Sequence, residues 1–262
     1  MKRKYLVVGV LVTLLVAGVG ALFLFPLDTT STEVPFEYGD SEQSASSGEI
    51  RVDGELFVAH EATVLGPDAA HVTHEYEQVT TEYFYEDGRV YTKYTTTADE
   101  DRESIRSDLE TDDDVVHYGH HEDRVVLVTE GQGTYDGGNL RSTRSITTRP
   151  LMSLNYDQVE DGSDGDYAVY EPSSAWVKLN RSLTRIDPER GDVRTDPETD
   201  VLRSMSLELS LTQASSYGEY LLQREPDGSI HVEYEYDPDP EPTTLETPDW
   251  VEQCVENDDC EF

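Results

Sequence analysis

Histidine is the residue type in this sequence that comes closest to forming a recognisable site. Two H-x-x-H spacings occur, His71 with His74 and His117 with His120, and His121 follows the second. In a strand, residues three apart point to opposite faces, and the H-E-x-x-H arrangement of zinc enzymes is absent. We therefore interpret these residues as surface and turn histidines and predict no metal site.

The acidic residues offer only weak calcium ligands. The runs Asp112–Asp114 and Asp161–Asp166 hold several carboxylates, but the second lacks the ligand order and the final Glu of an EF-hand loop. No G-x-S-x-G, S-x-x-K, P-loop or dinucleotide-binding motif occurs. Paired carboxylates carry no information in a chain with 56 Asp and Glu among 262 residues. We predict no enzymatic activity and no cofactor, with an extracellular hydrolase as the less favoured alternative.

Two further patterns indicate covalent modification outside the cell. Asn180-Arg181-Ser182 is an N-glycosylation sequon. Cys254 and Cys260, the only two cysteines, lie near the C-terminus with five residues between them and no histidine nearby. We expect them to form a disulfide loop that adds little to global stability, because the loop is short and terminal.

The composition is strongly acidic. The formal net charge is −37, from 56 Asp and Glu against 19 Lys and Arg, and this charge repels nucleic acid phosphates. We therefore expect no nucleic acid partner. Such acidity often accompanies disorder, but 16 tyrosines and clear strand alternation indicate a folded body. An acidic, lysine-poor surface is typical of halophilic proteins, because molar salt screens carboxylate repulsion beyond about 3 Å.

The elements that would position any site begin with a membrane anchor. Tyr5 to Phe25 is a run of 21 residues without a charge, preceded by Lys2, Arg3 and Lys4. As a helix it would be about 30 Å long, the thickness of the hydrocarbon core of a bilayer. We predict an uncleaved signal anchor, with a cleaved signal peptide and a buried soluble helix as alternatives. The basic residues should stay in the cytoplasm, so the main domain of this single-pass membrane protein should be extracellular.

Composition divides the chain into four parts. The anchor occupies residues 1–27, and residues 28–49, rich in Ser, Thr and Glu, indicate a flexible stalk that lifts the body off the membrane. Residues 50–252 carry the alternating segments and form the predicted extracellular sheet domain. Residues 253–262 form an acidic tail with the cysteine pair.

The clearest local signal is a β-hairpin around Asp87-Gly88. This dipeptide lies between two β-rich runs and favours a two-residue type I′ turn. The resulting register places oppositely charged or aromatic side chains across from each other: Glu86 and Arg89, Phe84 and Tyr91, Glu82 and Lys93. The opposite face carries Tyr83, Tyr85, Val90, Thr92 and Tyr94. We interpret this tyrosine face as core or as the lining of a groove.

A second hairpin is predicted near the C-terminus. Residues 219–225 and 229–236 flank Pro226-Asp227-Gly228, which suits a three-residue loop. The predicted pairs are Arg224 with Ile230, Leu222 with Val232, and Tyr220 with Tyr234. After the polyproline-like segment at 237–242, we expect Trp250 to pack back onto the sheet.

Other segments are assigned from local pattern. Residues 55–65 fit a helix and a strand alike. The remaining assignments are a short helix or loop at 99–114, a hairpin of 115–118 with 124–129, strands at 142–148, 167–170, 175–179 and 205–211, a short helix at 150–159, and a polar loop at 187–199.

An export signal, a helix-like segment ahead of an alternating hairpin, a meander and the closing Pro248-Asp249-Trp250-Val251 together resemble haloarchaeal envelope proteins. These in turn resemble the lipoprotein-carrier (LolA/LppX-like) class. The resemblance covers about Glu55 to Val251 and implies a curved antiparallel sheet wrapped over short helices, with an apolar cavity for acyl chains. The chain departs from this class because it has no lipobox cysteine, so an anchoring helix would replace the lipid.

We therefore predict an α+β fold with one curved, half-barrel-like antiparallel sheet, a few short helices and one N-terminal transmembrane helix. The leading functional hypothesis is a non-enzymatic envelope protein that binds a lipid or other apolar ligand in the concavity of this sheet, with Tyr83, Tyr85, Leu222 and Val232 in its lining. The alternative is a structural or protein-interaction module with a filled core.

Overall fold

The computed structural model describes residues 34–39, 41–97, 114–121, 124–137, 154–159, 167–179, 182–223, 225–241, 244–256 and 260. The segments predicted at 5–25, 99–113 and 142–148 lie outside these ranges, as do Asn180 and the acidic residues at 112–113 and 161–166. Within the described ranges, no helix is both long and apolar enough to cross a membrane.

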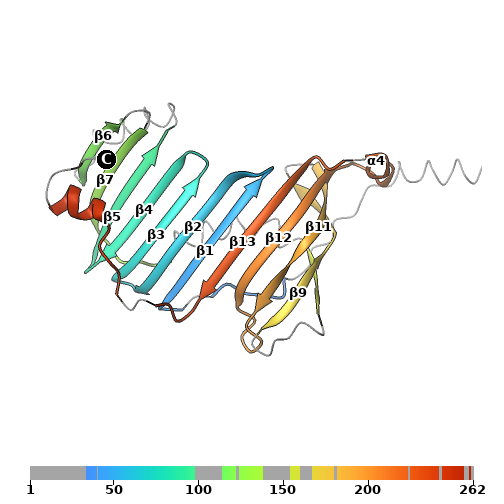
Figure 1. Ribbon diagram of the computed structural model, residues 1–262, viewed down its shortest axis with the longest axis horizontal. Helices are drawn as coiled ribbons and strands as arrows, with labels where there is room; N and C mark the ends of the chain where they lie inside the picture. The colour runs from blue at the N-terminus through green and yellow to red at the C-terminus, as the bar shows by residue number, and fades with distance from the viewer. Residues whose placement is uncertain are drawn as a thin grey trace, which may run out of the picture.

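One open, antiparallel sheet of 13 strands dominates the described chain (Figure 1). Its strands are β1 (Ser44–Val52), β2 (Glu55–Gly66), β3 (Ala69–Tyr76), β4 (Val79–Glu86), β5 (Arg89–Thr96), β6 (Val115–His121), β7 (Arg124–Gln132), β8 (Asn155–Gln158), β9 (Ala168–Ser173), β10 (Ala175–Leu179), β11 (Ser182–Thr195), β12 (Leu202–Gln213) and β13 (Gly228–Asp237). Few helices accompany the sheet: α4 (Tyr217–Leu222), α5 (Asp249–Val251) and the π-helix η2 (Glu252–Glu256). The prediction of a fold dominated by an antiparallel sheet with few helices is confirmed.

The first and last strands lie side by side at the centre of this sheet. The spatial order is β6-β7-β5-β4-β3-β2-β1-β13-β12-β11-β9-β8, with β10 paired to β11. β1 pairs along its length with β13, so that Ile50 lies opposite Val232 and Glu49 opposite Glu233. This pairing joins an N-terminal arm, β2 to β7, to a C-terminal arm that runs from β12 to β8.

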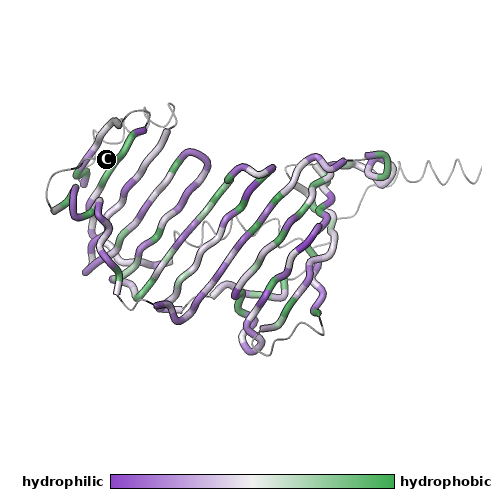
Figure 2. Tube along the Cα trace, viewed as in Figure 1, coloured by the Kyte–Doolittle hydropathy of each residue, from purple (hydrophilic) through white to green (hydrophobic). Residues whose placement is uncertain are grey.

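Strand alternation gives the centre of the sheet two different faces, as the colours along the strands in Figure 2 show. On β13, Ile230, Val232, Tyr234 and Tyr236 are buried, and these residues define what we call the apolar face. The alternate residues define the polar face: Ser229, His231, Glu233, Glu235 and Asp237. β12 repeats the pattern, with Met205, Leu207 and Leu209 opposite the buried residues of β13.

The main core covers the apolar face of the C-terminal arm. Ile186, Val193, Leu202 and Leu207 are completely buried there, and Phe36 packs against them from the segment before β1. Each such aliphatic side chain contributes about 1.5–3 kcal/mol of burial free energy. This part of the apolar face is therefore filled by side chains of the protein itself.

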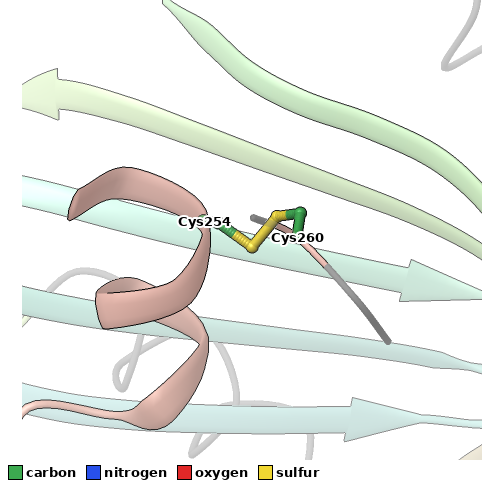
Figure 3. Close-up of a disulfide and its surroundings, with 2 residues drawn as sticks. All are labelled: Cys254 and Cys260. Atoms are coloured by element: carbon green, nitrogen blue, oxygen red, sulfur yellow. A yellow bond between two sulfur atoms is a disulfide. The ribbon is translucent and has the colours of Figure 1, made fainter. Parts of the chain in front are cut away.

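The C-terminal residues 249–256, which we call the C-terminal clamp, cover the N-terminal arm on the side away from the apolar face. Trp250 is buried against Phe84, Tyr91 and Val128, which confirms the prediction that this tryptophan packs onto the sheet. A disulfide joins Cys254 to Cys260 beside the π-helix (Figure 3). The arm is consequently apolar on both sides where the clamp lies.

The first predicted hairpin is confirmed in its register. Glu86 pairs with Arg89, Phe84 with Tyr91 and Glu82 with Lys93. Asp87 and Gly88 have φ values of 51° and 78°, as a type I′ turn requires. The hairpin of 115–118 with 124–129 is also confirmed as β6 and β7, and residues 55–65 are a strand rather than a helix.

The flexible stalk predicted at 28–49 is wrong for the part that the structure describes. Phe36 is buried, Glu37 bridges to Val201, and residues 44–49 belong to the central strand β1. The polar composition misled the prediction because β1 presents small residues to its apolar face. At position 48, an added Cβ would lie only 2.7 Å from the His60 ring, so this position of β1 needs a glycine.

The second predicted hairpin is also wrong. Ser216 caps a helix at 217–222 by accepting a hydrogen bond from the Glu219 N–H, so these residues form α4 instead of a strand. β13 pairs with β12 and β1, which places Leu207 and Ile50 opposite Val232. Local turn propensity suggested the pairing, and the helix cap together with long-range strand pairing overrode it.

Two segments that were predicted as a helix and as a loop are strands. Residues 155–158 form β8 rather than a helix, and 187–195 belong to β11 rather than to a polar loop. Pro188 is tolerated because residues 187–192 pair with β12 on one side and with no described strand on the other, and the register shifts between Pro188 and Arg190. A proline has no N–H to donate, so bulges and local sheet edges are where it fits.

Candidate functional site

A broad hollow lies on the polar face at the centre of the sheet. It has a volume of about 600 Å³, and we call it the acidic trough. The residues around it come from β1, β2, β3, β11, β12 and β13: Ser47, Gly48, Glu49, Ala59, His60, Glu61, Thr73, Glu75, Asp192, Arg194, Ser204, Met205, Ser206, Glu233, Tyr234 and Glu235. Strands far apart in sequence thus supply adjoining rows of short polar and acidic side chains.

Carboxylates dominate the electrostatics of this trough. Its lining holds six, from Glu49, Glu61, Glu75, Asp192, Glu233 and Glu235, against the single guanidinium of Arg194. Arg194 is held by Asp192, whose Oδ2 lies 2.7 Å from the arginine Nε. Within the described ranges, Glu61, Glu75 and Glu235 are exposed and form no ion pair. These three carboxylates therefore set a negative potential over the hollow.

Ion pairs on the polar face follow the two-residue period of the strands. Glu49 pairs with Arg51, Asp187 with Arg185, Asp192 with Arg194, and Glu233 with His231. Residues two apart in a strand share a face, so each of these four basic side chains contacts a carboxylate of its own strand, whereas Arg190 of β11 pairs with Glu208 of β12. The Arg51 hydrogen bonds hold the pKa of the Glu49 carboxyl below its usual value.

One group beside the trough has the donor set of a metal site. Ligand atoms of Glu49, His231 and Glu233 lie within 4.8 Å of one another, and they would offer one nitrogen and two oxygens. Both oxygens of Glu49 are already bound by Arg51, at 2.8 and 3.2 Å. His231 Nε2 lies 3.0 Å from Glu233 Oε1. The group is therefore a satisfied ion-pair network in this structure.

Two smaller hollows continue the trough along the polar face of the C-terminal arm. One, of about 370 Å³, shares Ser47, Glu61, Arg194, Ser204 and Glu235 with it. The other, of about 430 Å³, shares Asp192 and Arg194. Tyr167, which is 40% exposed, borders both smaller hollows and is the aromatic side chain best placed to contact a ligand there.

The four residues predicted to line an apolar cavity are not brought together. Tyr83 and Tyr85 stack on the apolar face of β4, with ring centroids 6.5 Å apart. Val232 is buried in the main core, and Leu222 is 71% exposed on α4. The predicted cavity depended on the second hairpin. Because that hairpin does not form, the four residues lie in three separate places.

The histidines also fall in separate places. His60 is buried on the apolar face beside Tyr234, and burial lowers the pKa of His74 on the same face. His71 Nε2 lies within hydrogen-bond distance of Glu82 Oε1, at 2.8 Å. His231, at the trough, was not singled out in the sequence, although its alternation with Glu233 on a strand was a signal for a charged face.

Comparison of this chain with protein-family models, curated proteins and solved structures finds no match. The functional argument therefore rests on the geometry of the described residues. Neither a nucleophile beside a general base nor a closed metal shell occurs among the described residues that line the trough. What the trough offers is a broad surface of carboxylates and hydroxyls suited to binding.

Proposed function

We propose that this protein is a non-enzymatic binding module that holds a basic segment of a partner protein in its acidic trough. The observation that carries the proposal is the hollow of about 600 Å³ lined by six carboxylates and one guanidinium. Ser47, Ser204 and Ser206 add hydroxyl acceptors and donors between the carboxylates. Arginine side chains suit such a surface, because the guanidinium fork donates two parallel hydrogen bonds to a carboxylate.

The location belongs to the same proposal. Residues 5–25 would anchor the chain in the cell membrane with the N-terminus in the cytoplasm and the sheet outside. Support comes from the uncharged run of 21 residues and its basic flank. Membrane fractionation followed by protease treatment of intact cells tests this part, since an outward sheet domain is digested while the cells stay closed.

The trough is tested with a fluorescent peptide of alternating Arg and Ser and a matched peptide of Gln and Ser. The full chain, in detergent micelles and at several salt concentrations, should bind the Arg peptide and not the Gln peptide. A triple variant, Glu61→Gln, Glu75→Gln and Glu235→Gln, should weaken binding roughly tenfold. This estimate follows from three partly exposed ion pairs of about 0.5 kcal/mol each.

The control variant removes the same charge elsewhere. Glu86→Gln, Glu189→Gln and Glu241→Gln change three exposed carboxylates that do not line the trough. If both triple variants weaken the Arg peptide equally, net charge alone explains the attraction and the trough is not the site. Equal binding of the Arg and Gln peptides would reject a basic partner altogether.

A lipid or other apolar ligand is the second candidate. This candidate is favoured by the aromatic lining of the apolar face of the N-terminal arm. Tyr83 and Tyr85 stack there, and the ring centroid of Tyr135 lies 5.5 Å from that of Tyr85. The half-barrel curvature implied by the resemblance to lipoprotein carriers would enclose such a ligand. Native mass spectrometry of protein purified in high salt would detect a co-purified lipid, and a clean apo mass would count against this candidate.

A further inference from the structure

The exposed large aliphatic side chains of the described surface are both on the short helix α4. Leu221 and Leu222 are 65% and 71% exposed, and Tyr217 on the same helix is 49% exposed. The other exposed large hydrophobic residues in the described ranges are two tyrosines, Tyr76 and Tyr167. Figure 1 shows α4 beyond the end of the sheet. We call Tyr217, Leu221 and Leu222 the α4 tip.

The inner side of α4 is fixed to the sheet by aromatic contacts. The Trp176 ring lies 5.3 Å from the Tyr220 ring and 6.0 Å from the Tyr217 ring. The guanidinium carbon of Arg185 lies 5.6 Å from the centre of the Trp176 ring. The Tyr220 hydroxyl donates a hydrogen bond of 3.1 Å to the Asp187 carboxylate. The outward leucines are therefore held on a rigid support, and their exposure does not come from a loosely attached helix.

The length of chain before the described body limits how far the body can lie from the bilayer of the proposed anchor. Eight residues, 26–33, lie between Phe25, at the end of the predicted span, and Val34, which packs against the core. The nine Cα-to-Cα steps from Phe25 to Val34 cover at most about 32 Å when the chain is fully extended. Because residues 34–39 and β1 belong to the body, the long predicted stalk is reduced to a short tether, and the body stays close to the membrane surface.

The tether also limits the orientation of the body. Glu37 bridges to Val201, next to the start of β12, whereas α4 follows the end of β12. The 12 residues of this strand separate the two places by about 40 Å. Both constraints are satisfied when the strands are inclined to the membrane normal, because Val34 must stay within reach of the anchor while α4 meets the surface.

We propose that the α4 tip inserts its leucines into the interface of the same bilayer that holds the anchor. The chemistry fits this occupant, because tyrosine and tryptophan are enriched at membrane interfaces and aliphatic side chains enter the acyl boundary. α4 carries no Lys or Arg and has Glu219 in its first turn, so electrostatic attraction to anionic lipids is excluded as the driving force. The contact should therefore persist, or strengthen, as salt increases.

The inference rests on the proposed anchor, and the experiment separates the two. The full chain carrying Leu222→Cys is labelled with an environment-sensitive fluorophore and reconstituted into liposomes that contain brominated lipid, in molar salt. Cys254 and Cys260 are joined, so the new thiol is the one labelled. The control label is at Asp239→Cys, an exposed position in the loop after β13. Bromolipid should quench the label at 222 several-fold more than the label at 239.

Each other outcome contradicts a defined part of the proposal. Failure of the chain to float with liposomes rejects the anchor itself. Flotation with equal, weak quenching at 222 and 239 leaves the anchor intact and rejects the docking of α4. A label at 222 that is shielded from iodide but not quenched by bromolipid, together with dimers in mass photometry, would assign the tip to a second copy of the chain instead. Circular dichroism of each labelled protein verifies that the sheet is retained.

Discussion

Glu82 and Lys93 face each other across β4 and β5, with the carboxylate and ammonium 3.5 Å apart. Lys93 Nζ lies 5.7 Å from the centre of the Trp250 ring, and His71 contacts the same carboxylate at 2.8 Å. Burial alone would raise the pKa of Glu82, but its hydrogen bond with His71 and the charge of Lys93 lower it overall. One of the few lysines of this chain thus stabilises a half-buried carboxylate beneath the C-terminal clamp.

Replacing this lysine should destabilise the protein more than replacing an exposed arginine. Lys93→Ala leaves the half-buried Glu82 carboxylate without its lysine partner, so we expect the free energy of unfolding to fall by about 1–3 kcal/mol. Arg89→Ala removes a more exposed pair with Glu130 and should cost clearly less than Lys93→Ala, because solvent screens that pair. Denaturant unfolding in high salt measures both values. Equal losses would mean that the Glu82 network adds no stability of its own.

His74 should make stability depend on pH near neutrality. Burial lowers its pKa, so the folded state keeps this imidazole neutral while the unfolded chain, with a pKa of about 6.5, takes up a proton more readily. The free energy of unfolding should therefore be fully retained above pH 6.5 and should decrease as the pH falls below it. His74→Gln should flatten this part of the profile. A variant with an unchanged slope would assign the dependence to other groups.

Gly191 should not tolerate a side chain. Its φ is +125°, and an added Cβ would collide with the Ser206 carbonyl oxygen and lie 2.8 Å from the Leu207 Cα of β12. Gly191→Ala should lower the free energy of unfolding by roughly 2–4 kcal/mol, because strain and a backbone clash add. Gly54→Ala is the matched control, since φ is +85° but no atom lies within 4 Å, and about 1 kcal/mol is expected. Similar losses in thermal or denaturant unfolding would remove the packing argument.

The C-terminal clamp should protect the N-terminal arm. Trp250→Ala removes a buried ring from its contacts with Phe84 and Val128, and a loss of about 3–5 kcal/mol is expected. Hydrogen exchange should accelerate in β4, β5 and β7 before it does so in β12 and β13. Cys254→Ser with Cys260→Ser should cost no more than about 2 kcal/mol, because the loop it opens is short. Uniform acceleration over the whole sheet would contradict a local role for the clamp.

Most of the confirmed predictions were local. The Asp87-Gly88 turn, its register and the β6–β7 hairpin follow from neighbouring residues, because a two-residue turn fixes which side chains face each other. The packing of Trp250 onto the sheet was also anticipated. The acidic trough was not, because its lining comes from strands as distant as β2 and β11, and its carboxylates look like ordinary surface charge when read along the chain.

The sequence by itself determined the polar and apolar sides of strands with clear alternation, such as β4, β5 and β12, together with the acidic surface, the run that predicts an anchor and the tight hairpin. These properties depend on residue types at fixed local spacing. Only the tertiary structure decided that β1 lies beside β13, that residues 217–222 form a helix, and that Leu222 and Val232 occupy unrelated places. Backbone hydrogen bonds between distant strands carry no residue signature, so neighbours in such a sheet are chosen by the packing of the whole chain.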